Sequence, residues 1–155
     1  MSRMNKAFGD TVETRLRHIG ATEIRKVNGI LYFIEFDIEK DLKVTYTYNI
    51  NSKNKFYLQR IKPYPIPEGV FEKEHEIVKF IESDIKKFRN AKNSKNFQLF
   101  LRITKDVNAI YADMERLFLN YNVDKVDLVK LKKEFNDIEE FFISTREKSN
   151  KIDID

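Results

Sequence analysis

Two stretches of the 155-residue chain contain basic side chains and no acidic ones, a composition that suits contact with an anionic partner. The first basic segment, 42–67, and the second basic segment, 85–105, hold 12 of the 29 lysine and arginine residues and none of the 25 acidic residues. The rest of the chain contains the other 17 basic residues and all 25 acidic ones. Its net charge is therefore −8, although the net charge of the whole chain is +4. The charge is therefore segregated along the chain.

Nine cations of these segments form the candidate partner-binding set. They are Lys53, Lys55, Arg60 and Lys62 in the first basic segment, and Lys86, Lys87, Arg89, Lys92 and Lys95 in the second. The second segment is the stronger candidate, because its cations surround a single expected helix junction at 90–96. Cations at a helix C-terminus complement the helix dipole, but Lys92 and Lys95 lie beyond that helix and need another explanation.

The alternative is a solvated, lysine-rich face without a partner. Lys, Ile, Asn, Phe and Tyr make up 70 of the 155 residues. These amino acids have AT-rich codons, which indicates a gene from a low-GC bacterium or one of its phages. Part of the lysine excess can therefore reflect codon bias and not a binding surface.

Aromatic side chains accompany the cations of the first basic segment, a combination that holds single-stranded nucleic acid through stacking and phosphate contacts. Strand alternation places Tyr46 and Tyr48 on the expected core face, whereas Lys43 points to the opposite side. Only Tyr57 and Tyr64 remain as candidate surface aromatics. Nucleic-acid binding through these segments stays open as the alternative function.

Other residue types with reactive side chains form no convincing motif. The chain has no cysteine, and its four glycines are isolated, which excludes disulfides, thiolate catalysis and a glycine-rich phosphate loop. His18 and His75 have neither a nucleophile motif nor metal-ligand spacing around them. Asp37, Glu39 and Asp41 gather near an expected turn, where a solvated turn is a simpler explanation than a Mg²⁺ site. We therefore expect no enzyme activity, no cofactor and no metal.

The elements that position these residues follow from hydrophobic periodicity. Helical spacing of apolar residues predicts a helix at 4–19, ended by Gly20 in a left-handed conformation. Alternation of apolar and polar residues, together with turn signals that begin at Asn28-Gly29, predicts four antiparallel strands. Three prolines and Gly69 are then expected to end the sheet. The expected strands are 23–27, 30–38, 42–50 and 56–62, and the expected later helices are 71–90, 97–121 and the segment after Asp124.

The predicted fold class is α+β: an N-terminal helix, a four-stranded antiparallel β-meander, then three helices with the last two as an antiparallel helical hairpin. The length predicts a single domain, 1–155, with two possible lobes. One lobe, 1–69, would hold the first helix and the sheet, and the other, 70–148, a helical bundle. Leu31 and Phe33 lie on the opposite face from Ile34 and Phe36, so something must cover each side of this strand, and the first helix is the nearest candidate for one side.

No motif in the chain identifies a family. In size and composition it resembles small phage-encoded inhibitors of host defence, such as anti-CRISPR proteins, and that resemblance implies an inhibitor of a nucleic-acid-handling host enzyme. We expect a small non-catalytic binding protein that docks on an acidic-surfaced partner protein through its basic surface. The alternative is a nucleic-acid-binding accessory protein that contacts phosphates through the same segments.

The sequence also predicts where such a protein would act. No apolar run approaches the ~20 residues that cross a bilayer. Residues 1–20 lack the apolar core of a signal peptide. We therefore expect a soluble, cytoplasmic protein without membrane contact, and the oligomeric state stays open.

Overall fold

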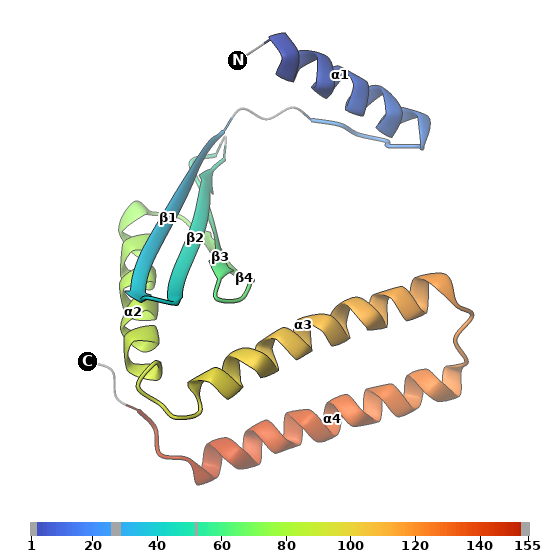
Figure 1. Cartoon of the computed structure of the whole chain (residues 1–155). Helices are drawn as coiled ribbons and strands as arrows, with labels where there is room; N and C mark the ends of the chain where they lie inside the picture. The colour runs from blue at the N-terminus through green and yellow to red at the C-terminus, as the bar shows by residue number, and fades with distance from the viewer. Residues whose placement is uncertain (1–2, 26–28, 52, 153–155) are drawn as a thin grey trace.

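The computed structural model describes residues 3–25, 29–51 and 53–152 (Figure 1). Helix α1 (Arg3–His18) precedes an antiparallel sheet with the strand order β1-β2-β3-β4, and three helices follow the sheet. The prediction of an α+β fold with an N-terminal helix, a four-stranded antiparallel sheet and three later helices is therefore confirmed. The strands are β1 (Ile30–Glu39), β2 (Leu42–Ile50), β3 (Phe56–Lys62) and β4 (Ile66–Phe71), and the later helices are α2 (Glu74–Ala91), α3 (Phe97–Asn120) and α4 (Lys125–Lys148).

One of the four strands differs from the expected set. Residues 23–25 have no regular secondary structure, and 26–28, which include Asn28 of the predicted turn, lie outside the described residues. The fourth strand is β4, in the segment whose prolines argued against a strand. Pro67 is tolerated because β4 has only one neighbouring strand, and a register shift between Leu58 and Gln59 accommodates it.

The register of the first hairpin preserves the predicted faces. Ile34 lies opposite Tyr46 on the face that meets the core. A three-residue loop at 39–41 would place Ile38 opposite Leu42, but Glu39 lies there instead, because a bulge follows Asp37. A bulge adds one residue to one strand, so the alternation of the earlier residues is unaffected.

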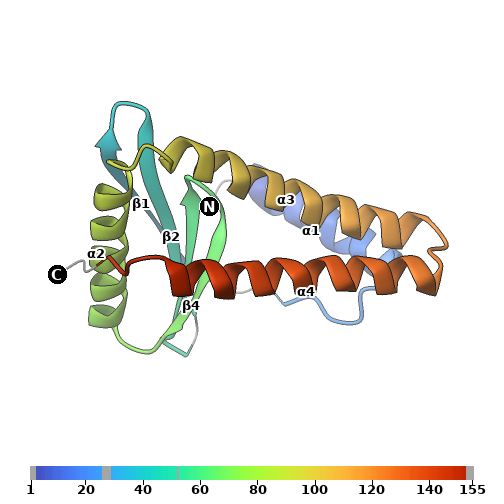
Figure 2. The same cartoon turned by 90° about the horizontal axis from the view of Figure 1, so that it is seen from below.

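Helix α2 supplies the helical half of the core. It covers one face of the sheet (Figures 1 and 2), and its buried residues recur every three or four positions, as on one face of a helix. The first residue of α3, Phe97, also joins this core at 5% exposure. The core consists of Leu42, Val44, Tyr46, Phe56, Leu58, Ile77, Ile81, Ile85, Phe88 and Phe97.

Helices α1, α3 and α4 project away from this core, with α3 and α4 antiparallel to each other (Figures 1 and 2). The chain exposes 13528 Å² of surface. A compact protein of the same mass, 18.6 kDa, exposes roughly 8,200 Å². The excess surface shows that the projecting helices bury little of themselves within one copy of the chain.

The face of the sheet opposite α2 is one of the uncovered surfaces. Leu31 and Phe33 are 69% and 64% exposed, so α1, the nearest candidate, does not cover this face. On α1, Val12 and Leu16 are also exposed. In the described ranges, no helix has the length and apolar character needed to span a membrane.

Candidate functional site

The fold divides the nine candidate cations between the two ends of the sheet. Lys53 and Lys55 lie before β3, and Lys62 ends it, so the seven residues of β3 separate them by roughly 20 Å. Because α2 runs antiparallel to β4, its C-terminus lies at the Lys62 end (Figure 1). That end, here called the basic end, contains Lys62, Lys86, Lys87, Arg89, Lys92 and Lys95.

Two contacts bring the turns of the sheet to the basic end. Tyr64, in the turn after Lys62, packs on Phe88 of α2, with the ring centroids 6.2 Å apart. The Lys92 ammonium lies 2.9 Å from the Glu39 carboxylate at the end of β1. The fold thus joins a strand end, a helix end and the α2–α3 turn at one place.

Four cations of the basic end have no ion-pair partner within the part of the chain that the structure describes. They are Lys62, Lys87, Arg89 and Lys95. The other two are paired: Lys86 with Glu82, 3.9 Å away on the same helix, and Lys92 with Glu39. The basic end therefore presents a net excess of positive charge to solvent.

A cleft of about 520 Å³ lies beside the basic end, between the β1–β2 turn and the start of α3. Its polar rim carries both signs of charge, from Glu39, Lys40, Asp41 and Lys92. Phe97 contributes an apolar wall. A cleft with this lining fits a side chain that is partly apolar and partly polar.

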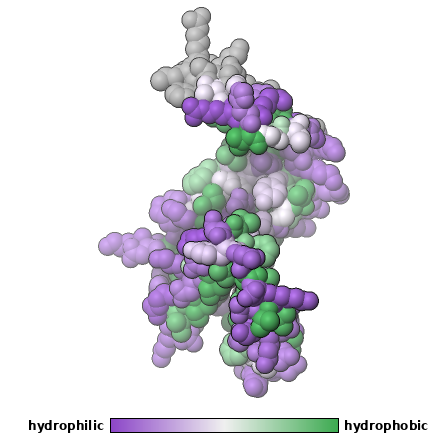
Figure 3. Space-filling view, turned by 90° about the vertical axis from the view of Figure 1, so that its right-hand side faces the viewer, coloured by the Kyte–Doolittle hydropathy of each residue, from purple (hydrophilic) through white to green (hydrophobic). Residues whose placement is uncertain are grey.

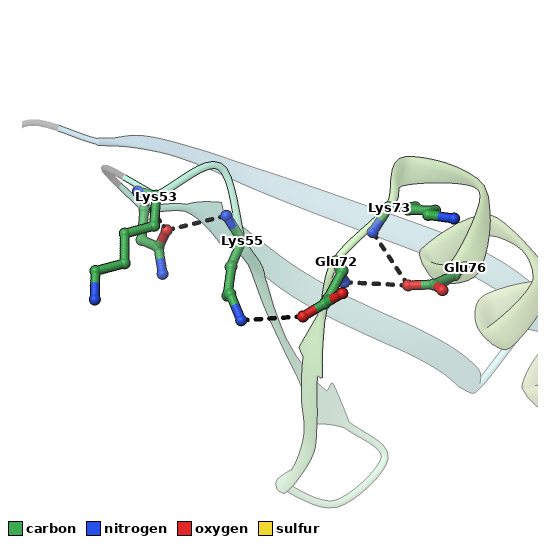
Figure 4. A network of polar contacts seen from close by, with 6 residues as sticks. Lys53, Lys55, Glu72, Lys73 and Glu76 are labelled. Carbon is green, nitrogen blue, oxygen red and sulfur yellow. Dashed lines mark hydrogen bonds and ion pairs between the residues drawn. The ribbon is translucent and has the colours of Figure 1, made fainter.

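At the other end of the sheet, Lys55 belongs to a local network that holds the start of α2 (Figure 4). The Lys55 ammonium lies 3.1 Å from the Glu72 carboxylate, and the backbone N–H groups of Glu72 and Lys73 both donate to Glu76 Oε2 at 3.1 Å. These two hydrogen bonds lower the pKa of Glu76, because they stabilise its ionised form. Lys55 thus has a structural role, and Lys53 extends beside this network (Figure 4).

Arg60 is not part of any surface, which corrects its place in the candidate set. Its side chain is only 7% exposed, and its guanidinium contacts the carboxylates of Asp84 at 2.6 Å and Glu68 at 3.2 Å. The guanidinium also lies 4.6 Å from the ring centre of Tyr64 and 5.0 Å from that of Phe88. A buried cation needs such partners, because leaving water costs it several kcal/mol.

A tyrosine completes this buried cluster. The Tyr46 hydroxyl donates to Asp84 Oδ2 at 2.6 Å. Burial raises the pKa of Tyr46, and the hydrogen bond to Asp84 raises it further. Burial also raises the pKa of Glu68, against the opposing effect of Arg60. The cluster is enclosed between the sheet and α2, so it stabilises the fold and offers no open site for a substrate.

From the sequence, Asp84 and Glu68 were not singled out as buried partners of Arg60. The available signal was the position of Asp84 on the apolar stripe of α2, three residues after Ile81 and one before Ile85. A carboxylate at such a position must meet a buried cation or donor. Its partner, Arg60, is on the core face of β3, next to Leu58 in the alternating pattern.

The histidines and the acidic turn form no reactive constellation. His18 and His75 are both exposed, and Lys43 is paired with Glu35 and, at 3.3 Å, with Asp37. Within the described residues, no group of three or more histidine and acidic side chains is arranged to hold a metal ion.

The comparisons with known proteins give no relative for this chain. No family model matches it, and neither a curated protein nor a solved structure is significantly similar to it. The functional interpretation therefore depends on the surface of this chain alone.

Proposed function

We propose that this protein is a non-catalytic binding protein that docks on an acidic surface of a partner protein through the basic end. The supporting observation is that cations from three separate segments meet at one end of the fold, and four of them lack an ion-pair partner among the described residues. A concentrated charge of one sign steers a partner of the opposite sign and selects against like-charged ones.

The neighbouring carboxylates favour a protein partner over nucleic acid. Glu39 and Asp41 line the cleft beside Lys92, and Glu82 accompanies Lys86. A phosphate backbone crossing this end would meet these negative charges, whereas a protein surface can present lysines or arginines opposite them.

The aromatic residues offer little to the nucleic-acid alternative. Tyr64 packs against Phe88 and Phe100, so its ring is not free to stack on a base. Tyr57 is 40% exposed, but it precedes Leu58 near the opposite end of β3. The alternative would therefore depend on phosphate contacts without stacking at the basic end.

The more specific role, inhibition of a nucleic-acid-handling host enzyme by a phage protein, stays a prediction from size and composition. Such an inhibitor needs a surface that docks on its target, and the proposed basic end would supply that surface.

Three baits test the proposed function. The first is the wild-type chain, and the second is Arg89→Glu/Lys95→Glu at the basic end. The third, Lys53→Glu/Lys73→Glu, makes the same charge change at the opposite end of the sheet. We expect the wild type and the third bait to retain the same acidic protein from a bacterial lysate, and the second bait to lose it.

Calorimetry with the purified partner then quantifies the loss. Arg89→Glu/Lys95→Glu should weaken binding at least tenfold and lower the unfolding free energy by no more than about 1 kcal/mol, since both side chains are exposed and only Arg89 lies in the last turn of α2. Equal affinity of the two double variants would overturn the proposed role of the basic end. Binding of a 30-nucleotide single strand at 50 mM salt, with a steep loss at 150 mM, would instead favour the nucleic-acid alternative.

A further inference from the structure

The projecting hairpin of α3 and α4 carries an apolar stripe along each helix. On α3 the stripe recurs at alternating steps of four and three residues, the spacing of a helix that packs in a bundle. Its members are Ile103, Val107, Ile110, Met114, Leu117 and the following Tyr121. Five of the six are exposed, from 44% at Leu117 to 68% at Tyr121, so packing of α3 against α4 leaves the stripe largely uncovered.

The stripe of α4 is also incompletely covered. Leu128, Leu131 and Phe135 are partly buried, whereas Ile138 and Phe142 are 47% and 64% exposed. Near the turn of the hairpin, a cleft of about 360 Å³ opens between the helices, and all but one of its lining residues are apolar or aromatic. Helices that pack completely interdigitate their side chains and leave no such gap.

The exposed area of the two stripes is close to what one partner buries in a stable interface. Seven of their large apolar side chains are exposed: Ile103, Val107, Ile110, Leu117, Tyr121, Ile138 and Phe142. With about half of each side chain open to water, they present on the order of 700 Å², compared with the ~800 Å² that each partner buries in a complex of standard size. Figure 3 shows hydrophobic surface in green on the side toward which these helices project.

The charges of the two helices are arranged to suit an antiparallel copy of themselves. In α4, residues 125–136 contain four basic and two acidic side chains, and residues 137–148 contain two basic and four acidic ones. The halves of α3 carry +1 (97–108) and −1 (109–120) in the same order. The helix dipole favours acidic N-terminal and basic C-terminal turns, so it does not explain this distribution.

Contacts within one copy leave these charges available. In the described part of the chain, the ion pairs of α3 and α4 join residues of the same helix: Arg116 with Asp113, and Lys130 with Asp127. An antiparallel second α4 would place its acidic half, with Glu139 and Glu140, beside the basic half of the first. A two-fold axis makes that contact twice, which is the commonest symmetry of homodimers.

We propose that the hairpins of two copies of this chain pack together around a two-fold axis and form a four-helix bundle, with α4 antiparallel to α4 of the second copy. The apolar stripes form the centre of the bundle, and side chains of one copy fill the cleft between the helices of the other. This inference is independent of the proposed function, because it uses the hairpin and not the cations of the basic end.

Sedimentation and light scattering of the full chain test the dimer. The wild type should be a dimer at 10 µM (~10⁻⁵ M, above the micromolar upper end of dissociation constants for interfaces of standard size). Ile110→Glu and Ile138→Glu should each raise the dissociation constant more than tenfold. Val129→Glu is the matched control, because Val129 is 59% exposed but lies outside the stripe of α4. A monomeric wild type, or equal dimerisation of all three variants, would overturn the proposal.

Charge reversal leaves the apolar stripe unchanged. It tests whether the partner is a second copy of the chain and whether the two α4 helices are antiparallel. Lys132→Glu/Lys133→Glu makes α4 acidic along its length, and Glu139→Lys/Glu140→Lys makes it basic. Each double variant alone should dimerise at least tenfold more weakly than the wild type, and their mixture should form a heterodimer at wild-type strength. If mixing does not restore association, the antiparallel pairing is wrong. The proposal is also overturned if the wild type forms no dimer and instead binds a different protein through this stripe.

Discussion

Arg60 and Asp84 form an ion pair inside the core, with Arg60 Nη1 2.6 Å from Asp84 Oδ2, although 24 residues separate them in the chain. The pair joins β3 to α2, and both side chains are almost fully buried. Three further groups enclose it: the Tyr46 hydroxyl, the Glu68 carboxylate and the ring of Phe88. The attachment of α2 to the sheet is therefore ionic as well as apolar.

Asp84→Asn should destabilise the protein by about 3 kcal/mol, because the buried Arg60 loses its shorter ion pair and keeps the longer contact with Glu68 at 3.2 Å. Urea unfolding measures this loss. Asp113→Asn is the matched control, since its pair with Arg116 is exposed and should cost less than about 0.5 kcal/mol. Equal losses in the two variants would show that Arg60 does not depend on Asp84.

Tyr46→Phe should cost about 2 kcal/mol, the range expected when a hydrogen bond to a buried charged group is removed. Tyr46 is fully buried and donates to Asp84, so the variant removes one donor from the carboxylate. Tyr57→Phe, on the same sheet at 40% exposure, is the control and should change the unfolding free energy little. A neutral Tyr46→Phe would mean that Arg60 alone satisfies Asp84.

Glu68 should make stability depend on pH in the direction opposite to most carboxylates. Burial raises its pKa above the ordinary value of 4.5, so the folded state holds the proton more tightly than the unfolded state. The stabilising contribution of this group is complete below pH 4.5 and is lost as the pH rises through the folded pKa.

The comparison with Glu68→Gln isolates this effect. The unfolding free energy of the wild type minus that of Glu68→Gln should decrease between pH 4 and pH 7 (the direction set by a raised folded pKa). Glu147→Gln, at the exposed end of α4, controls for the loss of one negative charge. A difference that stays constant with pH would contradict the raised pKa.

Glu76 should show the opposite pH dependence. Hydrogen bonds from the backbone of Lys73 and Glu72 lower its pKa below 4.5, so its contribution is present above pH 4.5 and is lost as the pH falls through the folded pKa. Glu76→Gln should therefore be less stable than the wild type at pH 7, and the two should converge in acid. Thermal unfolding at several pH values measures the convergence, with Glu74→Gln as a control in the same helical turn. If both variants respond equally to pH, the effect belongs to the helix dipole and not to the two backbone hydrogen bonds.

The helices and three of the four strands could be predicted from the sequence, because their signals are local. Alternation over 30–38 and 42–50 indicates a pleated strand from the local pattern alone, and the periodicity over 97–120 indicates a helix. The fourth strand could not be read in this way. Pro67 argues against a central strand, and only the pairing of β4 with a single neighbour makes it acceptable.

Which charges share a surface follows from the tertiary structure and could not be predicted from the sequence. In the sequence, Arg60 and Lys62 belong to the same basic segment, yet Arg60 lies on the core face of β3 and Lys62 reaches the basic end. Burial of a charge depends on partners that are distant in the chain, here Asp84 and Glu68, and local composition contains no information about such pairs. The sequence shows which segments lack acidic residues. The pairing of the strands and the packing of α2 on the sheet determine which cations of those segments face solvent.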